Sequence, residues 1–142
     1  MAKIERLTQA SDSVRQDINV LIHQLSLRLP ECSSELLESI IADPNLEVWV
    51  VTEDAHIVGM AALVIVTIPE GRRAQMEDIV IDEKYRGQGL GEQLSKKLIE
   101  RARARDASVV TLSSRADRVA ANTLYVKLGF ESRETNVYRL EL

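Results

Sequence analysis

Three glycines lie within six residues at Arg86-Gly87-Gln88-Gly89-Leu90-Gly91, where a strand-like run gives way to a helical pattern. The first backbone amides of a helix have no intrahelical acceptor, and the helix dipole leaves a partial positive charge beside them. Glycines carry no Cβ, so the backbone can approach a bound group closely. Arg86 adds a charged donor at the edge of this cluster. The spacing therefore predicts a site for a pyrophosphate or similar anion.

The glycines alone are equally compatible with a tight turn, and two common nucleotide motifs do not fit them. A Walker phosphate loop requires GxxxxGK[ST], and no Gly-Lys pair follows at that offset. A dinucleotide fingerprint requires GxGxxG, but Glu92 stands where Gly87 and Gly89 would need the third glycine. The surrounding sequence must therefore identify the anion.

Hydrophobic periodicity predicts the elements that position the cluster. Helical spacing covers Ser11–Leu29, a segment that begins after Ser33 and is closed by Asp43-Pro44, Leu90–Arg105 and Val119–Leu128. Strand patterns cover Val48–Val51, Ile57–Ile68, Gln75–Asp82, Val109–Leu112 and Thr135–Leu140. Helices, then an antiparallel hairpin, then alternating strands and helices indicate an α/β fold with a mixed sheet covered by helices.

The composition indicates one domain over residues 1–142. The chain is 45% hydrophobic and 28% charged, and its net charge of −4 argues against a general role in coating nucleic acid. The single cysteine, Cys32, and two histidines form no metal-binding pattern, so no metal is expected and Cys32 is predicted to be a buried small residue. No apolar run reaches the length of a membrane span, and the N-terminus lacks a signal-peptide pattern, which together predict a cytoplasmic protein with no membrane partner.

Two segments resemble the GNAT superfamily of acetyl-CoA-dependent N-acyltransferases. The glycine cluster fits that family's [RQ]-x-x-G-x-[GA] signature, and Glu77 to Tyr85 before it is also in the family's style. Residues Ala121 to Phe130, with the sequence ANTLYVKLGF, resemble the family's A-x-x-L-Y-x-K-x-G-F segment. The resemblance is sharp from Gln75 to Phe130. It implies a mostly antiparallel sheet with a splayed central strand and helices on both faces.

The resemblance also implies how acetyl-CoA, the expected cosubstrate, is bound. Its pyrophosphate would lie on the loop of Arg86, Gly87, Gln88, Gly89, Leu90, Gly91 and Glu92, with Leu90 facing the core and Glu92 contributing only its amide. Its pantetheine arm would pair with free backbone groups of a bulged strand at Ile79, Val80 and Ile81. Asn122 matches a position whose side chain reaches the cofactor, although it is equally well explained as a first-turn polar residue.

Two catalytic residues are implied by the same resemblance. Tyr125 matches a tyrosine that protonates the departing thiolate as a general acid. Glu77 stands nine residues before Arg86, where several members place a carboxylate base, whereas other members use a water relay. Asp78 should point to the opposite face if the strand is regular there. Ser113-Ser114-Arg115 and Arg118 fall near the expected acceptor. The two arginines could clamp an anionic acceptor or the cofactor's phosphate, or could equally belong to a solvated helix start, so no role is assigned to them.

The leading hypothesis is an N-acetyltransferase that moves an acetyl group to a primary amine by direct attack. The alternatives are a non-catalytic acyl-CoA-binding or regulatory domain of the same fold, and an unrelated nucleotide-binding domain that would prefer ATP or NAD. The acceptor is a small-molecule or peptide amine that no motif identifies, and acidity weakly favours a cationic or neutral one. A homodimer is compatible with the resemblance.

Overall fold

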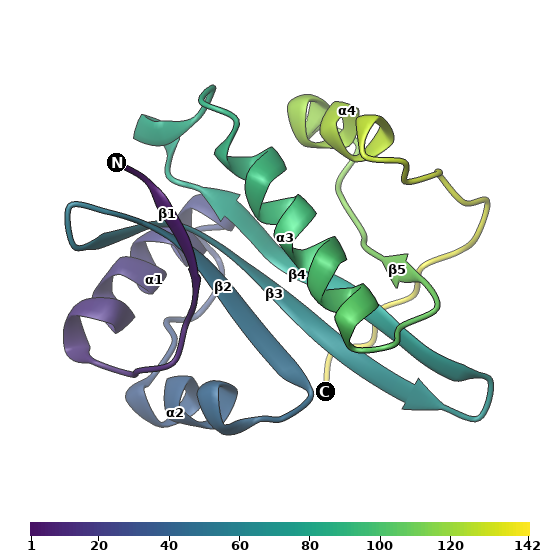
Figure 1. Cartoon of the computed structure of the whole chain (residues 1–142), viewed down its shortest axis with the longest axis horizontal. Coiled ribbons are helices and arrows are strands. Elements are labelled where there is room, and N and C mark those ends of the chain that lie inside the picture. Colours follow the sequence, from purple (N-terminus) through teal and green to yellow (C-terminus); the bar gives the residue numbers. More distant parts are fainter.

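The computed structural model describes residues 1–142, and its five strands form one sheet in the order β1-β2-β3-β4-β5 (Figure 1). The strands are β1 (Lys3–Arg6), β2 (Leu46–Glu53), β3 (His56–Ile68), β4 (Gly71–Ile81) and β5 (Val110–Thr111). The helices are α1 (Asp12–Leu25), α2 (Ser34–Ala42), α3 (Leu90–Ala104) and α4 (Val119–Lys127), with a 3-10 turn at η1 (Glu83–Tyr85). Strands β1 to β4 pair antiparallel, and β4 pairs with β5 in parallel.

Helices cover both faces of the sheet because each face buries its own apolar cluster. On one face Leu94 and Leu98 of α3 pack with Leu63 of β3. On the other face Leu21 of α1 and Leu37 of α2 belong to a second buried cluster. The mixed α/β architecture predicted from the sequence is therefore confirmed. No helix is both long and apolar enough to cross a membrane.

The first two helices begin where the sequence predicts and the first ends early. The Ser11 hydroxyl accepts a hydrogen bond from the Val14 amide at 3.2 Å, and the Ser33 hydroxyl accepts one from Leu36 at 3.1 Å. The prediction that α1 continues to Leu29 is wrong, because Ser26 adopts extended backbone torsions. The Ser26 hydroxyl then accepts from the Arg28 amide in a local turn that competes with the helix.

The strand predicted over Thr135–Leu140 is absent, and β1 was not predicted. Val137, Tyr138 and Leu140 are 82%, 86% and 83% exposed, so this segment has no apolar layer to pack against. An alternating pattern forms a strand only where a neighbouring strand and a buried face receive it. Strand β1 shows the converse, since its four residues pair with β2 along their whole length despite a polar sequence.

Strand β4 separates from β5 after a short contact. The two strands pair only at Ala74 with Val110 and Gln75 with Thr111, so the β5-facing edge of β4 is unpaired from Met76 to Ile81. The pairing with β3 is also interrupted, because Met60 lies opposite Val80 whereas Ala62 lies opposite Glu77. Asp78, inside this bulge, has a positive φ of 51°. The splayed and bulged strand expected from the resemblance is confirmed.

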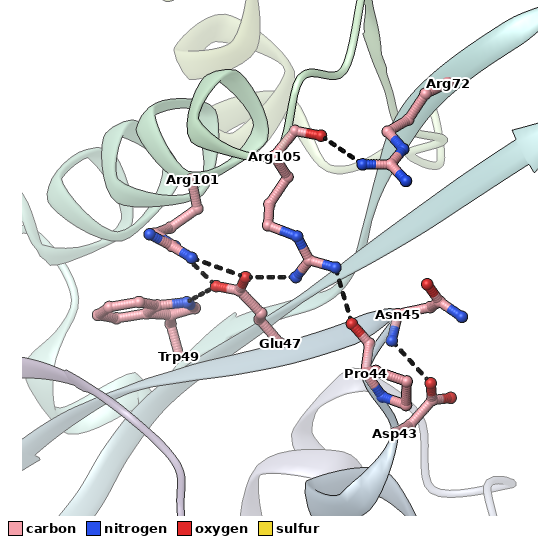
Figure 2. A network of polar contacts seen from close by, with 8 residues as sticks. All are labelled: Asp43, Pro44, Asn45, Glu47, Trp49, Arg72, Arg101 and Arg105. Carbon is pink, nitrogen blue, oxygen red and sulfur yellow. Dashed lines mark hydrogen bonds and ion pairs between the residues drawn. The ribbon is translucent and has the colours of Figure 1, made fainter.

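A buried ion network fixes α3 across the sheet (Figure 2). Glu47 of β2 is fully buried, and its carboxylate accepts hydrogen bonds from Arg101 at 2.8 and 3.0 Å and from Arg105 at 2.8 Å. The indole of Trp49 donates to the same carboxylate at 2.9 Å. Arg105 also donates to the carbonyl of Pro44 at 2.7 Å. These bonds join the C-terminal half of α3 to β2, and thereby help to place the glycine cluster at the other end of that helix.

Candidate active site

The unpaired edge of β4 presents backbone groups that the sheet does not use. Asp82 donates its amide to Val58 of β3, so by alternation Val80 also faces β3 while Ile79 and Ile81 face the open edge. Two arginine side chains confirm this orientation. Arg118 donates to the carbonyl of Ile79 at 3.4 Å, and Arg86 donates to the carbonyl of Ile81 at 2.9 Å. The free amides for an added strand are therefore those of Ile79 and Ile81 rather than Val80.

The glycine cluster forms an unobstructed cradle at the start of α3. Gly87 and Gly89 both have a φ of 79°, and a Cβ placed on either would meet no atom within 4 Å. The backbone amides from Gly87 to Glu92 donate no hydrogen bond within the protein. Gly89 is the N-cap and supplies no side chain to satisfy them. These orphan amides fit a phosphate or pyrophosphate group, because such an anion can accept several of them at once.

One cavity of about 580 Å³ joins this cradle to the open edge of β4, and we call it the cofactor cavity. Its wall is formed by Ile79 to Ile81, the glycine cluster and the facing side of α4. Leu124 of α4 packs 3.8 Å from the position of a Cβ on Gly91. Lys127 also lines the cavity and forms an ion pair with Glu92 at 2.6 Å, which ties α4 to α3.

Tyr125 lies where the cofactor cavity meets a second cavity of about 670 Å³, and it lines both. Its side chain is buried, and its ring packs edge-to-face against Phe130 at a centroid distance of 6.0 Å. Burial raises the pKa of the Tyr125 hydroxyl, and the nearby Arg118 guanidinium opposes part of that change. The hydroxyl therefore holds its proton at neutral pH, as a general acid must.

The second cavity, which we call the acceptor cavity, is polar and carries Glu77 and Asp78 in its wall. Both residues are exposed, yet partial desolvation by the cavity wall raises the pKa of Glu77, and the adjacent Asp78 charge raises it further. Desolvation also raises the pKa of Asp78. The bulge explains why both neighbours line one cavity, because the strand is not regular at Asp78 and the expected opposite orientation does not hold.

The remaining predicted residues are divided between the cofactor cavity and other surroundings. Arg86, Gly87, Gly89, Gly91 and Glu92 line the cofactor cavity. Leu90 also touches that cavity, while its side chain is buried in the core as predicted.

Gln88 and Asn122 line neither cavity. The Asn122 side-chain amide instead donates to the carbonyl of Arg115 at 2.9 Å, which agrees with the reading of Asn122 as a polar residue that stabilises the helix start.

Arg118 and Lys127 were not predicted as site residues. Arg118 lines both cavities and Lys127 lines the cofactor cavity. Lys127 stands within the second family-like segment, so its motif position was the available signal. For Arg118 the spacing to Arg115 indicated only a possible anion clamp, because its contact with Ile79 depends on how α4 packs beside β4.

Comparison with known proteins agrees with this geometry. The sequence profile of the acetyltransferase (GNAT) family matches residues 17–130. Glucosamine 6-phosphate N-acetyltransferase of Trypanosoma brucei brucei is 36% identical over 111 residues, which is 72% of this chain and 73% of that protein. A Bacillus subtilis (strain 168) protein with the provisional name [ribosomal protein bS18]-alanine N-acetyltransferase is 29% identical over 78% of this chain and 70% of its own length.

Other relatives are longer proteins. The chain spans 26–41% of the length of several vertebrate N-acetylaspartate synthetases that it matches. Among solved structures, a Clostridium acetobutylicum protein assigned as an acetyltransferase and solved with acetyl-CoA superposes with a TM-score of 0.79, covering 99% of this chain and 96% of that one at 16% identity. At that identity the likeness concerns the fold alone. Because the family profile covers most of the sequence, this chain belongs to the acetyltransferase (GNAT) family.

Proposed function

We propose that this chain is a single-domain N-acetyltransferase that moves an acetyl group from acetyl-CoA to a primary amine by direct attack. The proposal is carried by one observation: the open edge of β4 and Tyr125 line both the cofactor cavity and the acceptor cavity. Two reactants bound in adjoining cavities would meet at that shared wall. Holding them together in one orientation is itself a large part of catalysis.

Acetyl-CoA supplies an activated acyl group as a thioester. The orphan amides from Gly87 to Glu92 bind the pyrophosphate, and the amides of Ile79 and Ile81 orient the pantetheine arm as an added strand. The Ile79 or Ile81 amide also lies on the edge from which it can stabilise negative charge on the acyl oxygen.

Proton transfers at the shared wall complete the proposal. Glu77, directly or through water, accepts the proton that an ammonium group must lose before it can attack. Tyr125 donates its proton to the departing thiolate sulfur. No covalent intermediate with the protein is required.

The test is acetyl-CoA consumption in the presence of a panel of primary amines, followed by mass spectrometry of the products. We expect a mass increase of one acetyl group on at least one amine and release of one free thiol per product. Acetyl-CoA binding without acetylation of any amine would instead support the non-catalytic acyl-CoA-binding alternative. Preferential binding of ATP or NAD over acetyl-CoA would overturn both.

A further inference from the structure

A third cavity, of about 330 Å³, lies between the first two helices and the sheet, and we call it the apolar cavity. Most of its lining is aliphatic and comes from several elements. Ile22 of α1 lies on one side, Leu36 and Ile40 of α2 lie on another, and Val48 and Val64 come from β2 and β3. It has room for the body of a small organic molecule.

The apolar cavity ends at the carboxylates of the acceptor cavity. Glu77 and Asp78 line both, so the two spaces adjoin at the proposed catalytic base. The charged residues that line the apolar cavity are Glu31, Glu77 and Asp78, and all three are acidic. Within the apolar cavity such a wall disfavours phosphate or carboxylate groups, and at Glu77 and Asp78 it favours a positively charged end group.

Exposed apolar side chains lie beside the entrances to these spaces. Leu36 lines the apolar cavity and remains 51% exposed, while Leu29 lines the acceptor cavity and remains 41% exposed. Leu27 in the same connection is 86% exposed. Leu29 and Leu36 therefore belong to cavity walls and also present apolar surface to solvent, as residues of a binding surface do.

The wall of the apolar cavity is held by a buried side chain. Asn19 of α1 accepts a hydrogen bond from the Cys32 amide at 2.7 Å and donates one to the Cys32 carbonyl at 3.2 Å. Asn19 is 6% exposed, and these bonds pin the connection between α1 and α2 from inside. The cavity is therefore bounded by a fixed wall.

We propose that the acceptor is a primary amine with an apolar body, whose amino group lies at Glu77 and Asp78 and whose body fills the apolar cavity. This inference rests on the proposed function. In the reaction, a C–N bond forms between the amine and the acetyl carbon while the C–S bond of the thioester breaks. The ammonium group passes one proton to Glu77 before it attacks, and Tyr125 gives its proton to the departing thiolate. The second N–H proton of the adduct then restores Tyr125, so the products are an amide, a free thiol and one proton that Glu77 releases to solvent.

The first test compares kcat/KM for three amines with acetyl-CoA saturating. They are 2-phenylethylamine, ethanolamine and glucosamine 6-phosphate, which have an apolar, a small polar and an anionic body. Because burial of a phenyl group is favourable, we expect kcat/KM for 2-phenylethylamine to exceed that for ethanolamine by about tenfold to hundredfold. Glucosamine 6-phosphate has no apolar body, so its kcat/KM is also expected to fall below that of 2-phenylethylamine, even though Arg86, Arg115 and Arg118 line the adjoining acceptor cavity.

A second test fills the cavity. Ala62 of β3 lines it and is half-buried, so Ala62→Leu should lower kcat/KM for 2-phenylethylamine at least about tenfold more than for ethanolamine. Val66→Leu is the matched control, because Val66 lies on the same strand but does not line the cavity. Leu36→Lys, at an exposed position of the same wall, replaces an apolar contact with a charge and should lower kcat/KM for 2-phenylethylamine more than for ethanolamine. Ser39→Lys is its control on the same helix, because Ser39 does not line the cavity.

The outcomes separate the inference from the proposed function. Acetylation of ethanolamine or glucosamine 6-phosphate at a kcat/KM equal to or above that of 2-phenylethylamine would overturn the apolar acceptor and leave the acetyltransferase intact. Equal losses for all amines in Leu36→Lys would also overturn it. Failure to acetylate any amine, with acetyl-CoA still bound, would overturn the proposed function and this inference with it.

Discussion

Tyr125 lines both reactant cavities with a hydroxyl whose pKa is raised by burial. Tyr125→Phe removes the proton donor and keeps the ring that packs on Phe130. We expect kcat to fall by about a hundredfold while acetyl-CoA affinity changes less than about twofold. Steady-state kinetics and calorimetric binding measure the two effects. Tyr85→Phe is the control, because Tyr85 lines only the cofactor cavity. A kcat unchanged in Tyr125→Phe would remove the residue from the mechanism.

Glu77 predicts a specific pH dependence. A base must be deprotonated, so kcat/KM should rise with pH through the pKa of Glu77, which desolvation and Asp78 raise above its usual 4.5. Glu77→Gln should abolish this acidic limb. Asp78→Asn removes a negative neighbour and should move the limb to lower pH while keeping it. Profiles measured over the acidic range test both, and an unaltered limb in Glu77→Gln would assign the base elsewhere.

For individual residues, the sequence motifs predicted which residue types form the site and where many of them lie. The glycine cluster, Tyr125 and the Lys127 position all stand within recognisable segments. The orientation of Asp78 was not predictable, because it depends on a bulge set by the partner strand. Arg118 was unassignable for a similar reason, since its carbonyl acceptor on Ile79 is 39 residues away.

The start of α3 provides a matched pair of glycine substitutions. Gly89 has a φ of 79°, so Gly89→Ala forces a side chain into left-handed backbone at a cost of about 1–2 kcal/mol. We expect a lower melting temperature and a several-fold higher KM for acetyl-CoA. Gly91→Ala is the control, because its Cβ would make only ordinary contacts at 3.7 and 3.8 Å. Equal effects of the two would contradict a conformational role for Gly89.

The Glu47 network joins α3 to the sheet, and we expect its contribution to the free energy of unfolding to be lost in acid. Burial alone would raise the pKa of Glu47, but hydrogen bonds from Arg101, Trp49 and Arg105 lower it to about 2. The unfolded chain therefore takes up the proton first, and stability present above pH 4.5 is lost as the pH falls toward about 2. Glu47→Gln should cost about 2–4 kcal/mol at neutral pH and flatten this acidic loss.

Urea unfolding at neutral and acidic pH measures the Glu47 effect. Glu38→Gln on α2 is the control, because its side chain is exposed and makes no ion pair. A free energy of unfolding that falls as steeply with acid in Glu47→Gln as in the parent protein would contradict the assignment.

Element boundaries were predictable where local chemistry sets them. Ser11 and Ser33 cap helices that begin as expected, and the long apolar run of β3 ends at Ile68 as predicted. Periodicity does not reveal whether a neighbouring surface is present. It therefore could not predict where α1 ends, or that Thr135–Leu140 forms no strand. Strand β1 could not be predicted from its polar sequence, because it forms only through pairing with β2, which periodicity does not reveal.

The whole molecule is negatively charged, but the lining of its cofactor cavity is mostly positive. The chain carries −4 overall, yet the cofactor cavity beside the start of α3 is lined by Arg86, Arg118 and Lys127 against one acidic residue, Glu92, which pairs with Lys127. A polyanionic cosubstrate held there should bind less tightly as salt rises. We expect the KM for acetyl-CoA to increase several-fold between low and about 0.5 M ionic strength, with little change in kcat. A KM independent of salt would argue against electrostatic binding at this cavity.

The two arginines on the open edge of β4 have a further consequence for the protein before it meets a ligand. An unpaired strand edge is a template on which other chains can pair and aggregate. Arg86 and Arg118 occupy the outward carbonyls of Ile81 and Ile79 and set two positive charges in front of them. The amides of this edge stay free for the cosubstrate, but the occupied carbonyls and the two positive charges disfavour pairing with a strand of another polypeptide. The arginines therefore oppose self-association of the sheet through β4.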